Sequence, residues 1–164
     1  MDLRAVQKPL KERYREEPGD AHITLVARGS EASNAAACSV DIGRAVHETQ
    51  AHAGVGGEGT APCSGDLLLG ALAACAQVTC QMVASASGIP TERIEVTVEG
   101  SLDLRGTLGI DREAPVGFEE ITLRFDIDAP DASREQLEGL IEKTERYCVV
   151  LQTLRTPPVV ELVS

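Results

Sequence analysis

The chain has 164 residues, which is enough for one ordinary domain, or for one protomer whose core a partner completes, and too few for two independent domains. Apolar residues make up 43%, yet there is no Trp and only two Phe and two Tyr, so the core must be built from Leu, Val, Ile and Ala. A net charge of −11 would repel a phosphate backbone, which excludes nucleic-acid binding from the functions considered.

The first twenty residues alternate Lys, Arg and Glu and lack the apolar centre of a signal peptide. We expect residues 1–20 to form an arm or short helix that ends at Pro18–Gly19, and residues 21–164 to form a single domain. We also expect a cytoplasmic location.

Short strands are expected next in the chain. Residues 23–28 alternate apolar and polar side chains, and two further strands are expected at 38–42 and 45–49. The stretch 53–60 reads AGVGGEGT, which is typical of a glycine loop.

A long helix is the most clearly delimited element in the sequence. Ser64 is the expected N-cap, Asp66 complements the dipole in the first turn, and Gly88 with Pro90 follows the C-terminal end. Residues 67–86 carry no charge and could span a bilayer by length. Their Gln and small residues instead favour a helix buried in protein.

Two longer amphipathic strands and a second helix should follow. Apolar residues fall on even positions over 94–104 and on odd positions over 121–127, with a turn-rich connection at 106–117. Ser133 and Gln136 form a capping box that starts the second helix. The residues expected on its inward stripe are Leu137, Leu140, Ile141, Thr144, Tyr147 and Cys148.

Pro157–Pro158 should end the helical region, with a final strand at 159–163. This order of elements predicts an α+β domain with a mainly antiparallel sheet.

The five cysteines, at positions 38, 63, 75, 80 and 148, show no CxxC pair, no regular spacing and an odd total. A secreted disulfide framework is therefore a poor interpretation. Cys80 is about 140° around the helix from Cys75, so these two thiols should not cooperate. Cys38 and Cys80 are expected to be core hydrophobes, and the role of Cys63 stays open.

Cys75 and Cys148 lie on separate helices and could form a redox pair if their Cα atoms come within about 7 Å. The reactive form is the thiolate, whereas a free thiol has a pKa of about 8.5. Cys75 lies too deep in its helix for the dipole to help, so we expect a cation from Arg28, Arg44 or Arg146. The residues alone leave a redox dithiol and two inert core thiols both open.

Two segments resemble the OsmC/Ohr family. The run GDLLLGALAAC at 65–75 is similar to the central-helix signature that carries the family's peroxidatic cysteine. The run TERYCVV at 144–150 is similar to the segment that holds the resolving cysteine. The resemblance spans about residues 22–164 and is specific because both motifs occur in the right order.

The resemblance implies an OsmC-like fold, with a mainly antiparallel sheet wrapped around a buried central helix in an intertwined homodimer whose sites lie at the interface. It implies reduction of organic hydroperoxides through a Cys75 sulfenic acid and a Cys75–Cys148 disulfide. An external dithiol of the lipoyl type would then reset the enzyme. No bound cofactor, metal or membrane is implied.

The resemblance also suggests roles for further residues. Arg28 is the positional match for the arginine that assists the thiolate, and Leu68, Leu72 and Met82 would line an alkyl pocket. The family usually has a Glu ten residues before the nucleophile, where this chain has Gly65. Asp66, Glu58 or no carboxylate would take its part.

Two alternatives come from other functional classes. The first is a non-catalytic OsmC-like protein that binds a small apolar ligand in the same pocket. The second is a zinc protein using His47, His52 and Cys63, which is the weakest because their spacing matches no familiar ligand pattern. We expect the histidines to lie on the surface or in loops.

Overall fold

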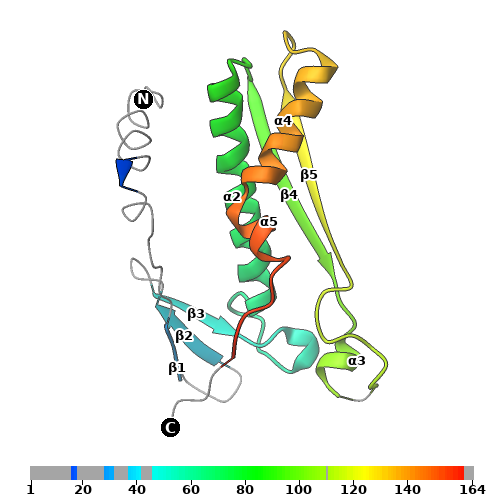
Figure 1. Cartoon of the computed structure of the whole chain (residues 1–164). Coiled ribbons are helices and arrows are strands. Elements are labelled where there is room, and N and C mark those ends of the chain that lie inside the picture. Colours follow the sequence, from blue (N-terminus) through cyan, green and yellow to red (C-terminus); the bar gives the residue numbers. More distant parts are fainter. Residues whose placement is uncertain (1–15, 18–27, 32–36, 42–45, 110, 161–164) are drawn as a thin grey trace. The chain divides into compact units, whose positions relative to one another are not determined.

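A computed structural model describes residues 16–17, 28–31, 37–41, 46–109 and 111–160 (Figure 1). The chain divides into two compact units, one of Met1–Leu69 with Gly100–Ile121 and one of Gly70–Glu99 with Thr122–Ser164. Apart from Glu16 and Glu17, the expected N-terminal arm lies outside the described residues, as does most of the strand expected at 23–28.

The first unit contains a three-stranded antiparallel sheet in the order β1-β2-β3, made of β1 (Arg28–Glu31), β2 (Ala37–Asp41) and β3 (Val46–Gln50). Val40 of β2 lies opposite Gly29 on one side and His47 on the other. The second and third strands match the expected positions within a residue at each end. A short 3-10 helix, η2 (Ala53–Val55), forms within the glycine loop.

Helix α2 (Ser64–Ser87) begins one residue earlier than expected. The carbonyl of Cys63 accepts the first helical hydrogen bond, from the Leu67 N–H at 3.1 Å, and the Asp66 carboxylate accepts from the Cys63 N–H at 2.8 Å. Cys63 is therefore the N-cap, and the prediction of Ser64 was wrong. Asp66 reaches back to the cap as the third residue of a capping box does, so its backbone-directed bond decides where the helix starts.

The C-terminal end of α2 follows the prediction. Gly88 adopts φ 68, the left-handed conformation that favours glycine, and its N–H donates to the Ser85 carbonyl at 3.3 Å. The Ile89 N–H donates to the Ala84 carbonyl at 3.0 Å, which completes a Schellman motif. The chain thereby turns away from the helix and places Ile89 in the core.

Strands β4 (Arg93–Ser101) and β5 (Glu120–Asp128) pair with each other. The Glu92 N–H donates to the Asp128 carbonyl at 2.7 Å, and the Glu119 N–H donates to the Ser101 carbonyl at 2.8 Å, so the strands are antiparallel. The more buried side chains fall on even positions of β4 and mainly on odd positions of β5, as expected.

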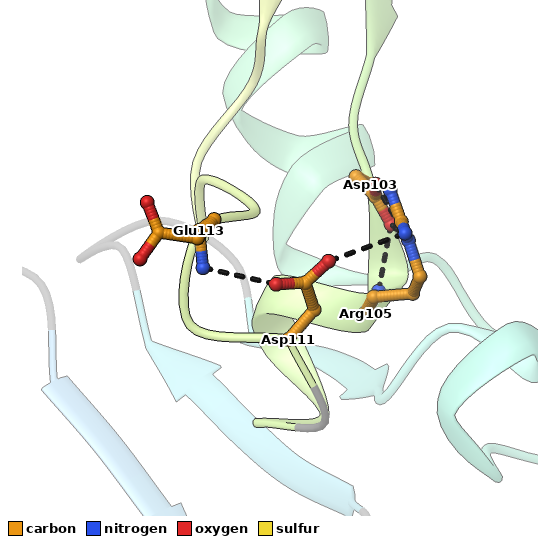
Figure 2. Close-up of polar contacts among 4 residues, drawn as sticks. All are labelled: Asp103, Arg105, Asp111 and Glu113. Atoms are coloured by element: carbon orange, nitrogen blue, oxygen red, sulfur yellow. Dashed lines mark hydrogen bonds and ion pairs between the residues drawn. The ribbon is translucent and has the colours of Figure 1, made fainter.

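Strand β4 is shorter than the alternation over 94–104 predicted. Asp103 caps a short helix, α3 (Leu104–Thr107), by accepting a hydrogen bond from the Arg105 N–H at 2.9 Å. Figure 2 shows that the Arg105 guanidinium contacts both Asp103 and Asp111, the latter at 3.2 Å, while Asp111 also accepts from the Glu113 N–H at 3.0 Å. These contacts hold together the connection between β4 and β5.

Helix α4 (Arg134–Tyr147) starts at the predicted capping box, with both of the reciprocal bonds between Ser133 and Gln136 present. Leu140, Thr144 and Cys148 are buried as expected. Tyr147 is 58% exposed, so its place on the inward stripe was wrong. Its ring instead lies under the Arg146 guanidinium, 5.7 Å from the ring centroid.

A second short helix, α5 (Val149–Thr153), follows α4 after the single residue Cys148. The expected final strand is not present at Val159 and Val160, which are 87% and 90% exposed and lie in no strand. Its remaining positions, 161–163, lie outside the described residues.

The core of the second unit joins α2, α4 and the β4–β5 pair (Figure 1). Cys80 and Ala84 of α2 pack with Ile89 and Leu140, surrounded by partly buried apolar side chains that include Ile94, Phe125 and Ile127. Complete burial of a side chain such as Leu140 contributes about 1.5–3 kcal/mol to folding. This packing fixes α2, which carries Cys75, and α4, which ends at Cys148.

Within one chain, α2 is buried on one face only. Leu72, Ala76, Cys80 and Ala84 recur every fourth residue and are buried, whereas Val78 is 52% exposed. The helix is long and apolar enough to cross a membrane, but core helices of soluble domains meet the same test. Packing of its buried stripe against α4 and β5 favours the core-helix interpretation.

Candidate functional site

Cys75 and Cys148 come together within the second unit. Cys75 lies midway along α2 and is partly exposed, while Cys148 lies between α4 and α5 and is fully buried. Their two thiol groups are hydrogen-bonded to each other. The pair of thiols expected from the sequence is therefore in direct contact, without a CxxC motif.

The helical backbone is interrupted at Cys148, where α4 ends and α5 begins. The Cys148 N–H closes α4 by donating to the Thr144 carbonyl at 2.9 Å, and the Cys148 carbonyl opens α5 by accepting from the Gln152 N–H at 3.0 Å. Cys148 itself is extended, with φ −72 and ψ 105. The first N–H groups of a helix have no partner within it, so those of Val149 and Val150 are free for another acceptor.

That acceptor is the sulfur of Cys75. Partial burial raises the pKa of Cys75, but hydrogen bonds from the Val150 N–H, the Cys148 thiol, the Thr79 hydroxyl and the Val149 N–H stabilise its thiolate. The bonds outweigh the burial, and the pKa of Cys75 lies below its ordinary value. Among the residues that the structure describes, the donors that lower this pKa are uncharged. The side chains of Arg28 and Arg44, two of the cations expected from the sequence, lie outside what it describes.

Cys148 has the opposite tendency. Burial is the largest influence and raises the pKa of Cys148, while the Leu151 amide lowers it. The hydrogen bond and negative charge of Cys75 raise it further, the Val150 amide has the smallest, lowering effect, and the pKa of Cys148 lies above its ordinary value. The first proton is therefore lost from Cys75 while Cys148 stays a thiol. Cys75 is therefore the thiol that ionises more readily, and Cys148 stays protonated beside it.

Cys80, five residues after Cys75, has a different setting. It is completely buried in the core, and burial raises the pKa of its thiol. Its contact is the hydroxyl of Thr144, which is itself buried. The side chain thus behaves as the small core hydrophobe that the sequence indicated.

The arginines proposed from the sequence are placed unevenly. Arg28 begins β1 in the first unit, and its side chain lies outside what the structure describes, as does all of Arg44. Arg146 stacks on Tyr147 at the surface. A role for Arg28 beside Cys75 stays a prediction.

Asp66 is engaged at the start of α2. The backbone N–H and then the thiol of Cys63 donate to its carboxylate, and these bonds hold the pKa of Asp66 below its ordinary value. A Cβ atom at the neighbouring Gly65 would lie 3.3 Å from Cζ of Phe118 and 3.5 Å from Sγ of Cys63. This crowding gives a physical reason for glycine where the family usually has a carboxylate. The catalytic role suggested for Asp66 stays a prediction.

Cavities in the first unit gather several of the remaining candidates. One of about 380 Å³ is lined in part by His52, Cys63, Asp66 and Phe118. The Nδ1 atom of His52 accepts a hydrogen bond from the Gly54 N–H at 3.0 Å. Among the residues that the structure describes, no three His, Cys, Asp or Glu side chains are grouped to hold a metal, so the zinc alternative gains no support.

The three residues suggested for an alkyl pocket differ in exposure. Leu72 is buried, whereas Leu68 and Met82 are 37% and 36% exposed. Leu68 lines a cavity of about 560 Å³ in the first unit. Their common role as a substrate pocket stays a prediction.

Sequence reasoning missed Thr79, Val149 and Val150. Thr79 follows Cys75 by four residues, the spacing that places two side chains on one helix face, so its proximity could have been found. The two amides carry no such signal, because they become available only where the chain breaks between α4 and α5.

Comparisons with known proteins agree with this fold. A family model described as OsmC-like protein matches residues 57–163. An OsmC-like protein from Mycoplasma pneumoniae is 20% identical with a TM-score of 0.66, covering 81% of this chain and 88% of its own. An organic hydroperoxide resistance protein from Elizabethkingia anophelis is 22% identical with a TM-score of 0.63, covering 82% and 89%.

A further similar structure is an OsmC-like protein of unknown function from Vibrio cholerae, with 12% identity, a TM-score of 0.67, and coverage of 82% of this chain and 96% of its own. A comparison with curated proteins gives no match. At these identities the solved structures support the fold alone, whereas the family model covers well over half of the sequence. The chain belongs to the OsmC-like protein family.

Proposed function

We propose that this protein is a thiol-dependent peroxidase that reduces organic hydroperoxides. The observation that carries the proposal is the contact between Cys75 and Cys148, with the pKa lowered at the first and raised at the second. An activated thiolate hydrogen-bonded to a neutral thiol is the arrangement that a two-cysteine peroxidase requires. Similar structures that include organic hydroperoxide resistance proteins add support.

In the first step, the Cys75 thiolate attacks the distal oxygen of the hydroperoxide. The O–O bond breaks, the alkoxide leaves and takes up a proton as an alcohol, and the sulfur is oxidised to a sulfenic acid. The Val149 and Val150 amides, which donate to this sulfur, would orient it for attack. The partial exposure of Cys75 gives the peroxide access.

In the second step, the Cys148 sulfur attacks the Cys75 sulfenic acid. A disulfide forms, and the hydroxyl leaves as water with the thiol proton. A dithiol, for which a lipoyl-type compound is the proposed source, then reduces the disulfide by exchange and is itself oxidised to a disulfide. The chain needs no bound cofactor for these steps.

The proposal includes a homodimer in the cytoplasm. Val78 on α2 is 52% exposed although it belongs to a helix with few charges, and a second copy is the proposed cover for this face. Size-exclusion chromatography with light scattering should give twice the mass of 17.4 kDa. A monomer at micromolar concentration would remove the dimer from the proposal and leave the chemistry standing.

The chemistry is tested by adding a slight excess of cumene hydroperoxide to the reduced protein and measuring intact and peptide masses. We expect the mass to fall by two hydrogens and one Cys75–Cys148 disulfide to form. Cys75→Ser should abolish the disulfide, and Cys148→Ser should leave a sulfenic acid at Cys75 that dimedone traps.

Cys80→Ala is the matched control, because this thiol is on the same helix and takes no part in the pair. It should form the disulfide at the wild-type rate. Survival of both Cys75 and Cys148 as thiols, or oxidation confined to Cys38 and Cys63, would refute the peroxidase.

A further inference from the structure

Two threonines contact cysteine sulfurs in the second unit, and they differ in where their hydroxyl proton goes. The Thr144 hydroxyl donates to the Leu140 carbonyl at 2.8 Å, within α4. This hydroxyl is therefore already engaged within its own helix, and it also contacts the Cys80 thiol. Burial favours the neutral form of Cys80 and outweighs a smaller lowering of its pKa by the Thr144 contact.

Thr79 is placed differently. It lies four residues after Cys75 on α2, so the two side chains are about 40° apart around the helix axis and stand one above the other. Its hydroxyl contacts the Cys75 sulfur, and this contact acts to lower the pKa of Cys75. A thiolate can only accept, so in the reactive form this hydroxyl must be the donor.

The other contacts of Cys75 limit what Thr79 must do. The Val149 and Val150 amides approach from α5, and the Cys148 thiol approaches from the junction of α4 and α5. Cys148 is the titratable group among these partners, and it stays protonated when Cys75 ionises. Among the described contacts of this sulfur, the Thr79 hydroxyl is the donor that comes from the same helix as Cys75.

We propose that Thr79 is a catalytic residue of this protein, whose hydroxyl donates to the Cys75 sulfur, holds its thiolate and aims it before attack. This inference rests on the proposed function of Cys75 as a nucleophile. It assigns to a neutral side chain on α2 part of the work that the sequence had suggested for an arginine.

The Thr79 hydroxyl is expected to leave the Cys75 sulfur once Cys75 is oxidised. Once Cys75 is in a disulfide, its sulfur carries no charge and is a weak acceptor. A threonine in a helix can instead donate to the carbonyl four residues earlier, as Thr144 does. For Thr79 that carbonyl belongs to Cys75 itself, so the donor would follow the redox state of the same residue.

The test measures the rate of alkylation of Cys75 by iodoacetamide between pH 5 and 10, followed by peptide mass. Thr79→Val keeps the shape and removes the donor. We expect its apparent pKa at Cys75 to rise and the alkylation rate at pH 6 to fall about tenfold, as for a lost hydrogen bond to a charged group. Thr79→Ser should restore the rate to within about twofold, since it restores the hydroxyl.

Thr144→Val is the matched control, because it removes a hydroxyl beside Cys80 and leaves the contacts of Cys75 intact. It should leave the Cys75 profile unchanged. If Thr79→Val titrates as the wild type does, if Thr79→Ser behaves like Thr79→Val, or if Thr144→Val has the same effect as Thr79→Val, the proposal fails. Circular dichroism shows which variants fold, and Thr79→Ala replaces Thr79→Val if that one does not.

Alkylation needs no peroxide, so the two proposals fail separately. A normal Thr79→Val profile together with disulfide formation by cumene hydroperoxide would remove only the role of Thr79. A shifted profile in a protein that does not react with peroxide would keep the role of Thr79 in ionising Cys75 and remove the peroxidase.

Discussion

Cys75 and Cys80 occupy the same helix, five residues apart, and have opposite chemistry. Cys75 is partly exposed and its sulfur accepts hydrogen bonds from another helix, which lowers its pKa. Cys80 is completely buried beside Leu140, and burial raises its pKa. Neither residue type nor helix position explains this difference, since both lie well inside α2.

The two thiols differ because they face different parts of α4, the helix that packs against α2. Cys80 faces the middle of α4, where the backbone amides are already used and a side chain can offer only an apolar contact or a hydroxyl. Cys75 faces the junction of α4 and α5, where amides are free. The lowered pKa of Cys75 therefore follows from the interruption of the helix at Cys148, which supplies both the backbone donors and the second thiol.

The largest expected difference between the two thiols is in their reaction with iodoacetamide in the folded, reduced protein. Cys75 should be alkylated on the order of 1,000-fold faster than Cys80, because Cys80 is inaccessible until the core opens and each tenfold corresponds to about 1.4 kcal/mol of opening. Peptide mass spectrometry at successive times measures both rates. In urea the two rates should converge, and a Cys80 that reacts as fast as Cys75 in the native state would contradict this account of the core.

The same substitution should have different costs at the two positions. Cys80→Ser puts a hydroxyl into an apolar core and should lower the free energy of unfolding by about 1–3 kcal/mol. Cys75→Ser, at a partly exposed position, should lower it by less than about 1 kcal/mol. Urea unfolding at pH 7 measures both.

Cys80→Ala is the control for volume, since alanine removes the sulfur without adding a polar group. It should cost about 1 kcal/mol, less than Cys80→Ser. Equal losses for Cys75→Ser and Cys80→Ser would mean that the two sites are not separated by burial.

Sequence reasoning located the two thiols because helix ends and buried stripes are local patterns. The Ser133–Gln136 box placed α4 and Gly88 ended α2, as predicted. The errors also arose from local hydrogen bonds. Asp66 accepts from the Cys63 N–H, which makes Cys63 rather than Ser64 the N-cap of α2. Asp103 accepts from the Arg105 N–H and starts a short helix at Leu104, where a strand was predicted. In both cases a carboxylate binds a nearby backbone amide, an interaction that an apolar–polar alternation pattern does not reveal.

The lowered pKa of Cys75 could not be predicted in the same way. Its donors, Val149 and Val150, act through backbone amides, which look alike for every residue type. Only the fold reveals that these amides lack helical partners and face α2. A charged side chain is visible in a sequence and was therefore the expected cause, whereas backbone donors of this kind become apparent only from tertiary packing.

The smallest expected difference is in how stability changes with pH. The folded pKa of Cys75 is lowered, so its contribution to stability is present above the ordinary thiol pKa of about 8.5 and is lost as pH falls through the folded pKa. The folded pKa of Cys80 is raised, so its contribution is present below about 8.5 and is lost as pH rises through the folded pKa. The two thiols should therefore tilt the pH dependence of unfolding in opposite directions.

This tilt can be measured in a Cys148→Ser background, which removes the thiol that titrates together with Cys75. Between pH 7 and 10, adding Cys75→Ala should make the protein progressively less stable than its parent, while adding Cys80→Ala should make it relatively more stable. One unit of pKa corresponds to about 1.4 kcal/mol, and solvent screening at the partly exposed Cys75 should keep its effect below that. Urea unfolding in the presence of a reductant gives both slopes, and slopes of the same sign would show that the shared helix, rather than the packing against it, sets the chemistry of its thiols.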